Sequence, residues 1–154
     1  MAAALEADDH TGVLEIGPGI GVLTKELSAV CGRVAAVELD RRLPDVLAET
    51  LADCSNVQVV PGDVLQMDLQ ALFADRFAGC DRLQVCANLP YYITTPVLMR
   101  LLESELPIER LVVMVQLEAS TPVWSSASSA AAIRGHTEGS IKKFCPSALE
   151  KVKP

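Results

Sequence analysis

Four short groups of residues in this sequence have the types and spacing that recognise nucleoside-like ligands. Each group ends or directly follows a short apolar run, so each is expected where a strand of a sheet ends. The groups are a glycine-rich run at residues 15–21, the acid Glu38, the pair Asp63-Val64 and the tetrapeptide Asn88-Leu89-Pro90-Tyr91. Together they suggest binding of a positively charged nucleoside and orientation of a planar amine.

The glycine-rich run places Gly17, Gly19 and Gly21 at alternate positions behind Glu15. Glycine allows positive φ and a close approach to a ligand, and the helix expected next offers free N–H donors. A dinucleotide site favours G-x-G-x-x-G to hold a pyrophosphate, an anion that Glu15 would repel. Ammonium and sulfonium groups suit this acid better, so the run predicts an S-adenosylmethionine turn. A tight turn without a ligand is the alternative.

Two further acids stand at the ends of the next two expected strands. Glu38 follows Gly21 by 17 residues, which in a doubly wound fold places its carboxylate beside the first crevice. It could accept hydrogen bonds there from both hydroxyls of an adenosine ribose, or it could be a solvated surface acid. Asp63 could accept from an adenine amino group while Val64 flanks the ring, although Gly-Asp is also a common turn.

The tetrapeptide that begins at Asn88 is the most specific signal. Methyl transfer to an exocyclic adenine amine is difficult because the lone pair of that nitrogen is delocalised into the ring. The side-chain oxygen of Asn88 and the backbone carbonyl next to Pro90 could orient the amine, and Tyr91 could stack on an extracted base. A turn with a packed tyrosine is the alternative.

The chain around these groups alternates between strand and helix patterns. Strands are expected at residues 12–16, 33–38, 57–60, 83–87 and 110–116. Helices are expected at residues 21–30, 43–52, 69–73 and 95–102. Parallel strands need crossover connections of this length, so we expect an α/β fold with a doubly wound, mostly parallel sheet.

The pattern changes after residue 116. Proline, glycine and serine interrupt residues 117–154, where only 130–134 and 147–152 could hold a helical turn. We therefore expect a mostly irregular segment there. Without a covering strand, the apolar strand at 110–116 would leave an exposed edge, and exposed edges favour self-association.

Composition restricts the class of protein. A chain of 154 residues, half of them hydrophobic, fits one folded domain. The apolar stretch at 111–115 is far too short to span a membrane, and the acidic start does not resemble a secretory signal. A cytoplasmic protein is expected.

Charge and cysteine content restrict the chemistry. The net charge is −7, and residues 1–116 carry 17 acids against 8 bases, which weighs against tight nucleic-acid binding by this chain alone. The five cysteines include no C-x-x-C pair, and there are only two histidines. We therefore expect free, buried thiols and neither a zinc site nor a Cys-His catalytic pair.

The four groups together resemble the ribosomal RNA adenine N6-dimethyltransferase family, over residues 12–118. The resemblance implies a Rossmann-like methyltransferase core that uses S-adenosylmethionine. Members of this family dimethylate adjacent adenines near the 3′ end of small-subunit ribosomal RNA. By that resemblance the cofactor would be contacted by Gly17, Glu38, Asp63 and Asn88, and the target base by Asn88, Pro90 and Tyr91.

The chain departs from the family pattern at both ends. Family members begin with a Gly-Gln-Asn-Phe-Leu segment that closes over the cofactor, and nothing before Gly12 resembles it. They continue after a stretch like residues 115–118 into two more strands and a helical RNA-binding domain. Residues 119–154 do not match these parts. We therefore expect a methyltransferase core at 1–118, incomplete at its C-terminus, and an unrelated tail at 119–154.

The sequence leaves three functions open. The first is the core of an enzyme that methylates small-subunit ribosomal RNA, alone or in a pre-ribosomal particle, with no membrane or metal partner. The second is a non-catalytic cofactor-binding or interaction module on the same scaffold. The third is a methyltransferase for a protein or a small molecule. The tetrapeptide at Asn88 favours the first over the third, because its acceptors suit a planar amine.

Overall fold

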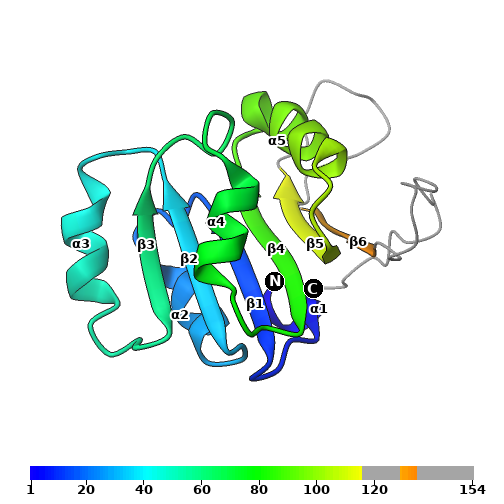
Figure 1. Ribbon diagram of the computed structural model, residues 1–154. Coiled ribbons are helices and arrows are strands. Elements are labelled where there is room, and N and C mark those ends of the chain that lie inside the picture. Colours follow the sequence, from blue (N-terminus) through cyan, green and yellow to red (C-terminus); the bar gives the residue numbers. More distant parts are fainter. Residues whose placement is uncertain (116–128, 135–154) are drawn as a thin grey trace.

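The computed structural model describes residues 1–115 and 129–134, which contain a six-stranded sheet (Figure 1). The strands are β1 (Thr11–Ile16), β2 (Arg33–Glu38), β3 (Val57–Pro61), β4 (Arg82–Leu89), β5 (Ile108–Val115) and β6 (Ser129–Arg134). Their order in the sheet is β3-β2-β1-β4-β5-β6, with β1 to β5 parallel and β6 antiparallel to β5. The expected doubly wound, mostly parallel α/β sheet is confirmed.

The helices cover both faces of this sheet. They are α1 (Ala2–Leu5), α2 (Val22–Ser28), α3 (Leu43–Thr50), α4 (Leu69–Arg76) and α5 (Tyr91–Glu103). Figure 1 shows α4 and α5 on one face, α2 on the opposite face, and α3 beside the edge strand β3. Helix α5 begins four residues before its expected start, directly after Pro90. The hydroxyl of Thr94 donates to the Pro90 carbonyl at 3.0 Å within this first turn.

Two apolar clusters hold the helices on the sheet. On the α4 and α5 face, Leu14 and Ile16 of β1 pack with Phe73 of α4 and Val97 of α5. On the other face, Val13 packs with side chains of α1 and α2. Successive side chains of a strand point to opposite faces, so a strand covered on both faces is apolar throughout. This is why continuous apolar runs located the strands correctly.

Strand β6 corrects the expectation for the segment after residue 116. Residues 130–134 were expected to hold at most a helical turn, and they form a strand that pairs with β5 from Arg110 to Val115. Alanine favours helices, but pairing satisfies the row of backbone groups that β5 would otherwise expose. The outer edge of β5 is therefore covered along this pairing by the chain itself. The helical turn expected at 147–152 lies outside the described residues.

Helix α1 was not expected from the sequence. It is one turn long, and its Leu5 is fully buried against the sheet. Arg110 of β5 donates to the carbonyl of Ala4 at 2.7 Å and to the Glu6 carboxylate at 2.7 Å. A buried arginine thus holds the carboxyl end of this helix, where free carbonyls favour a cation.

None of the helices in the described parts of the chain is both long and apolar enough to cross a membrane.

Candidate functional site

The four groups of residues meet at one edge of the sheet. Because β3, β2, β1 and β4 are parallel neighbours, their carboxyl ends lie side by side. Asp63, Glu38, Gly17 and Asn88 therefore follow one another across four adjacent strands. In open α/β sheets this edge, near the point where the strand order reverses, is where ligands bind.

The glycine-rich turn between β1 and α2 uses left-handed backbone at all three glycines. The φ angles of Gly17, Gly19 and Gly21 are 72°, 58° and 89°. A side chain at Gly19 would meet no atom within 4 Å, so this part of the turn faces open space. At Gly21 an added Cβ would lie 3.1 Å from Leu47 of α3. The turn is thus packed at its helix end and open in the middle, where a ligand could approach the backbone.

Glu38 ends β2, and its carboxylate binds both the glycine-rich turn and the loop that follows β2. It is buried, and its Oε2 accepts from the Gly19 N–H at 3.2 Å while its Oε1 accepts from the Asp40 N–H at 2.8 Å. Each carboxylate oxygen can accept a further hydrogen bond. Glu38 therefore positions the glycine-rich turn and keeps lone pairs for a ligand with hydroxyl groups.

Asp63 lies in the turn that follows β3. Its Oδ1 accepts from the Leu65 N–H at 2.9 Å, and its Oδ2 accepts from the Gln66 side-chain amide at 2.8 Å. Its backbone carbonyl also accepts from the N–H groups of Gln66 and Met67. Val64 is buried in the core beneath this turn. The carboxylate is held in one orientation at the end of β3.

The tetrapeptide joins β4 to α5. Asn88 is exposed, and its side-chain amide makes no hydrogen bond to any part of the chain that the structure describes. Leu89 is buried in the core, so only its backbone could touch a ligand. The Pro90 carbonyl already accepts from Thr94. Tyr91 begins α5, and the position of its side chain lies outside what the structure describes.

The backbone of this tetrapeptide lies near the start of the glycine-rich turn. A Cβ added at Gly17 would lie 3.9 Å from the Asn88 carbonyl oxygen, the nearest atom to it. The exposed Asn88 amide and the open part of the turn are thus on neighbouring strands.

Glu15 lies beneath the site instead of lining its surface. This residue is 1% exposed, and neither of its carboxylate oxygens makes a hydrogen bond at normal geometry within the described residues. Burial raises the pKa of Glu15 to about 7, the Thr24 hydroxyl partly opposes this, and the charge of Glu38 adds to it. Its predicted contact with a cofactor stays a prediction.

Sequence reasoning missed the apolar side chains around the site. Ile20, Val22 and Leu39 are each at least 60% exposed, and they flank the glycine-rich turn and Glu38. Exposed large apolar groups beside polar acceptors are typical of ligand sites. Their positions next to the motifs were visible in the sequence, but their exposure was not.

No cluster of histidine, cysteine or acidic side chains suited to a metal ion occurs within residues 1–115 and 129–134. Cys31, Cys54, Cys80 and Cys86 are free thiols, and Cys145 lies outside these ranges. Burial raises the pKa of Cys31 and Cys86 to about 12, which keeps both protonated and unreactive.

The strand order and the position of the four groups define a Rossmann-like methyltransferase domain. The chain resembles the crystal structure of the 23S rRNA methyltransferase ErmE, with a TM-score of 0.64 and 31% identity over 75% of this chain and 43% of that one. It also resembles a dimethyladenosine transferase from Plasmodium falciparum, with a TM-score of 0.60 and 26% identity over 74% of this chain and 38% of that one.

The sequence profile described as ribosomal RNA adenine dimethylase matches residues 1–132, and the chain belongs to this family. Ribosomal RNA small subunit methyltransferase A from Bacillus licheniformis is 46% identical over 79% of this chain. The protein of the same name from Alkaliphilus metalliredigens is 43% identical over 99% of it.

The chain spans 41% and 52% of the length of these two relatives. The family match extends beyond the 12–118 resemblance at both ends. The division of the chain at residue 118 stays a prediction.

Proposed function

We propose that this chain binds S-adenosylmethionine and transfers its methyl group to the N6 amine of adenines in small-subunit ribosomal RNA. The observation that carries the proposal is the row of Asp63, Glu38, Gly17 and Asn88 across four adjacent strand ends. The named relatives support the choice of RNA substrate. The two acceptors of the tetrapeptide, the Asn88 side-chain oxygen and the Leu89 carbonyl, suit an amine as the methyl acceptor.

The order of the residues across the sheet suggests which part of the cofactor each residue would bind. Glu38 would accept from the ribose hydroxyls, and Asp63 would accept from the adenine amino group over Val64. The open glycine-rich turn at Gly19 would lie against the methionine part. Glu15, buried behind this turn, would contribute negative charge near the ammonium and sulfonium groups. Bound S-adenosylmethionine would supply an activated methyl group.

The tetrapeptide would orient the acceptor. The side-chain oxygen of Asn88 and the Leu89 carbonyl would accept the two N–H groups of the adenine amine, which localises the lone pair on nitrogen. The amine so oriented would receive the methyl group by direct in-line transfer and would release a proton to solvent, with S-adenosylhomocysteine as the leaving group. No covalent intermediate with the protein forms. Tyr91 would stack on the extracted base.

Ribosomal RNA, alone or in a pre-ribosomal particle, would be the partner, in the cytoplasm. The acidic residues of the core give little attraction for phosphates, so we expect this chain to bind RNA weakly and to lose binding at moderate salt.

The test uses the chain as it stands, with calorimetric titration of S-adenosylhomocysteine followed by methyl transfer to unmethylated small-subunit particles. Glu38→Ala should weaken the affinity for S-adenosylhomocysteine by about 2 to 3 kcal/mol, roughly 30- to 150-fold, because it removes charged hydrogen-bond acceptors. Asn88→Ala should lose methyl transfer while its melting temperature stays that of the unchanged chain. Glu49→Ala, on the exposed surface of α3, is the matched control and should behave as the unchanged chain.

Failure to bind S-adenosylhomocysteine would overturn the proposal. Binding without methyl transfer would instead favour the non-catalytic cofactor-binding module. Full transfer by Asn88→Ala would remove the role assigned to the tetrapeptide.

A further inference from the structure

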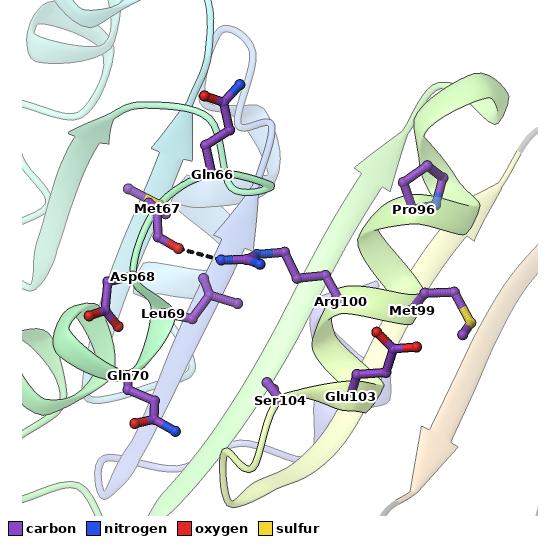
Figure 2. A pocket seen from close by; sticks show the side chains of 10 residues that line it. All are labelled: Gln66, Met67, Asp68, Leu69, Gln70, Pro96, Met99, Arg100, Glu103 and Ser104. Carbon is purple, nitrogen blue, oxygen red and sulfur yellow. Dashed lines mark hydrogen bonds between the residues drawn. The ribbon is translucent and has the colours of Figure 1, made fainter.

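An arginine of α5 reaches across to the turn that carries Asp63. Figure 2 shows Arg100 extending from α5 toward the backbone of Met67. Its Nη2 donates to the Met67 carbonyl at 2.6 Å, and its Nε donates to the Val64 carbonyl at 3.1 Å. One guanidinium therefore binds both ends of a four-residue stretch of backbone.

That stretch also fixes the Asp63 carboxylate. Within the turn, the Leu65 N–H and the Gln66 side chain hold the two carboxylate oxygens of Asp63. The N–H groups of Gln66 and Met67 both bind the Asp63 carbonyl. The turn is thus a small internally bonded unit, and Arg100 provides two charged hydrogen bonds that attach it to α5.

Helix α5 is the element that begins inside the tetrapeptide motif, at Tyr91. Arg100 lies in its last turn, between Val97 and Leu101, both buried in the core of the same face. The position of the turn therefore depends on α5, a helix that is itself packed on the sheet. Displacement of either element would change the distance between the two halves of the site.

We propose that Arg100 is a positioning residue that fixes the adenine-recognising turn around Asp63 to the helix that follows the methyl-acceptor motif. This inference rests on the proposed function, in which Asp63 accepts from the adenine amine of the cofactor. Arg100 touches neither ligand. It acts through the backbone of Val64 and Met67.

A lysine could not replace this residue. The planar guanidinium presents Nε and Nη2 in a fixed fork, which matches two carbonyls three residues apart, whereas an ammonium is a single point of attachment. The side chain also borders a surface pocket of about 520 Å³ between the turn and α5, lined by Gln66, Pro96 and Glu103 among others (Figure 2). Water can therefore reach the two carbonyls when the arginine is removed, so we expect the fold to survive its replacement.

The experiment compares two ligands on Arg100→Gln, Arg100→Lys and the unchanged chain. S-adenosylhomocysteine carries the adenine amine, and S-inosylhomocysteine has a carbonyl oxygen in its place. We expect the unchanged chain to prefer S-adenosylhomocysteine. Arg100→Gln should bind it about tenfold more weakly and lose most of the preference, because Asp63 is no longer held in place. The affinity and the preference of Arg100→Lys should lie between those of the unchanged chain and those of Arg100→Gln.

The matched control is Arg110→Gln, which removes another guanidinium that binds a backbone carbonyl, on the opposite face. It should lower the melting temperature and leave the ratio of the two affinities unchanged. A ratio in Arg100→Gln and Arg100→Lys equal to that of the unchanged chain would overturn the inference and leave the proposed function intact. Equal affinities for both ligands in the unchanged chain would instead contradict the role of Asp63, and the inference with it.

Discussion

The two faces of the sheet are built from the same strands, but they bury different kinds of side chain. On the face under α4 and α5, the buried side chains of β1 are apolar, namely Leu14 and Ile16. The opposite face buries Glu15 and Gln84 on neighbouring strands, together with Arg110 on β5. Of these three, only Arg110 has hydrogen bonds of normal geometry within the described residues.

Because of this difference, we expect substitutions on the two faces to affect stability in different ways. Burying apolar surface stabilises the fold, whereas burying a polar group without a hydrogen bond costs free energy. The polar face is also the face of α2, whose first turn follows the glycine-rich turn. Glu15 therefore lies behind the proposed cofactor site, whereas Gln84 lies opposite Val13, nearer the amino ends of the strands. We therefore expect substitutions on the apolar face to change mainly stability, and substitutions on the polar face to change how stability depends on pH and salt.

The largest effect is expected from Phe73→Ala on the apolar face. Phe73 is buried, and its ring packs against Phe77 with centroids 5.1 Å apart. Its removal should lower the free energy of unfolding by about 3 to 5 kcal/mol, measured by urea denaturation. Val46→Ala, on the exposed surface of α3, should change it by less than about 0.5 kcal/mol. A loss below about 1 kcal/mol for Phe73→Ala would show that this face does not carry the stability.

A smaller, pH-dependent effect is expected from Glu15→Gln on the polar face. The pKa of Glu15 is raised from 4.5 to about 7 by burial, so between these values the folded chain holds a proton that the unfolded chain releases. The contribution of this group to stability therefore falls as pH rises from about 4.5 to 7. Above pH 7 its charged form costs on the order of 3 kcal/mol.

Glu15→Gln should remove this dependence and stabilise the chain at pH 8, measured by denaturation at pH 5 and pH 8. The exposed Glu49→Gln serves as the control and should keep the pH dependence of the unchanged chain. Parallel pH profiles for Glu15→Gln and the unchanged chain would contradict the buried, protonatable state of this acid.

The strands and the row of site residues could be predicted because they depend on local pattern. Apolar runs of four to eight residues mark buried strands, and parallel connections bring their carboxyl ends together without further information. This is why Glu38 and Asn88 were expected near the same crevice. The bonds of Glu38 to Gly19 and Asp40 then follow from that proximity.

The rest of the site depends on contacts that are distant in sequence. Arg100 binds the carbonyl of Val64, 36 residues earlier, and no periodic pattern links such positions. Burial of Glu15 was also invisible, because its place in an apolar run does not show how deeply α2 covers it. Strand β6 was missed because its alanine-rich sequence favours a helix, and only the free edge of β5 makes a strand preferable.

The smallest effect is expected from Glu6→Ala, which removes one of the two hydrogen-bond partners of the buried Arg110 on the polar face. The Arg110 side chain is 5% exposed while that of Glu6 is 66% exposed, and their atoms lie 2.7 Å apart. After the substitution, Arg110 keeps its bond to the Ala4 carbonyl. We therefore expect a loss of about 1 kcal/mol in urea denaturation at low salt, within the range for a partly exposed ion pair.

That loss should shrink as salt is added, because the exposed carboxylate is screened. Asp75→Ala removes the exposed partner of Arg76 and should cost no more than a few tenths of a kcal/mol at any salt concentration. A Glu6→Ala loss as small as that of Asp75→Ala would mean that the Ala4 carbonyl alone satisfies the buried Arg110. The polar face would then be held to α1 by a backbone contact, and the contrast between the two faces would rest on Glu15 and Gln84.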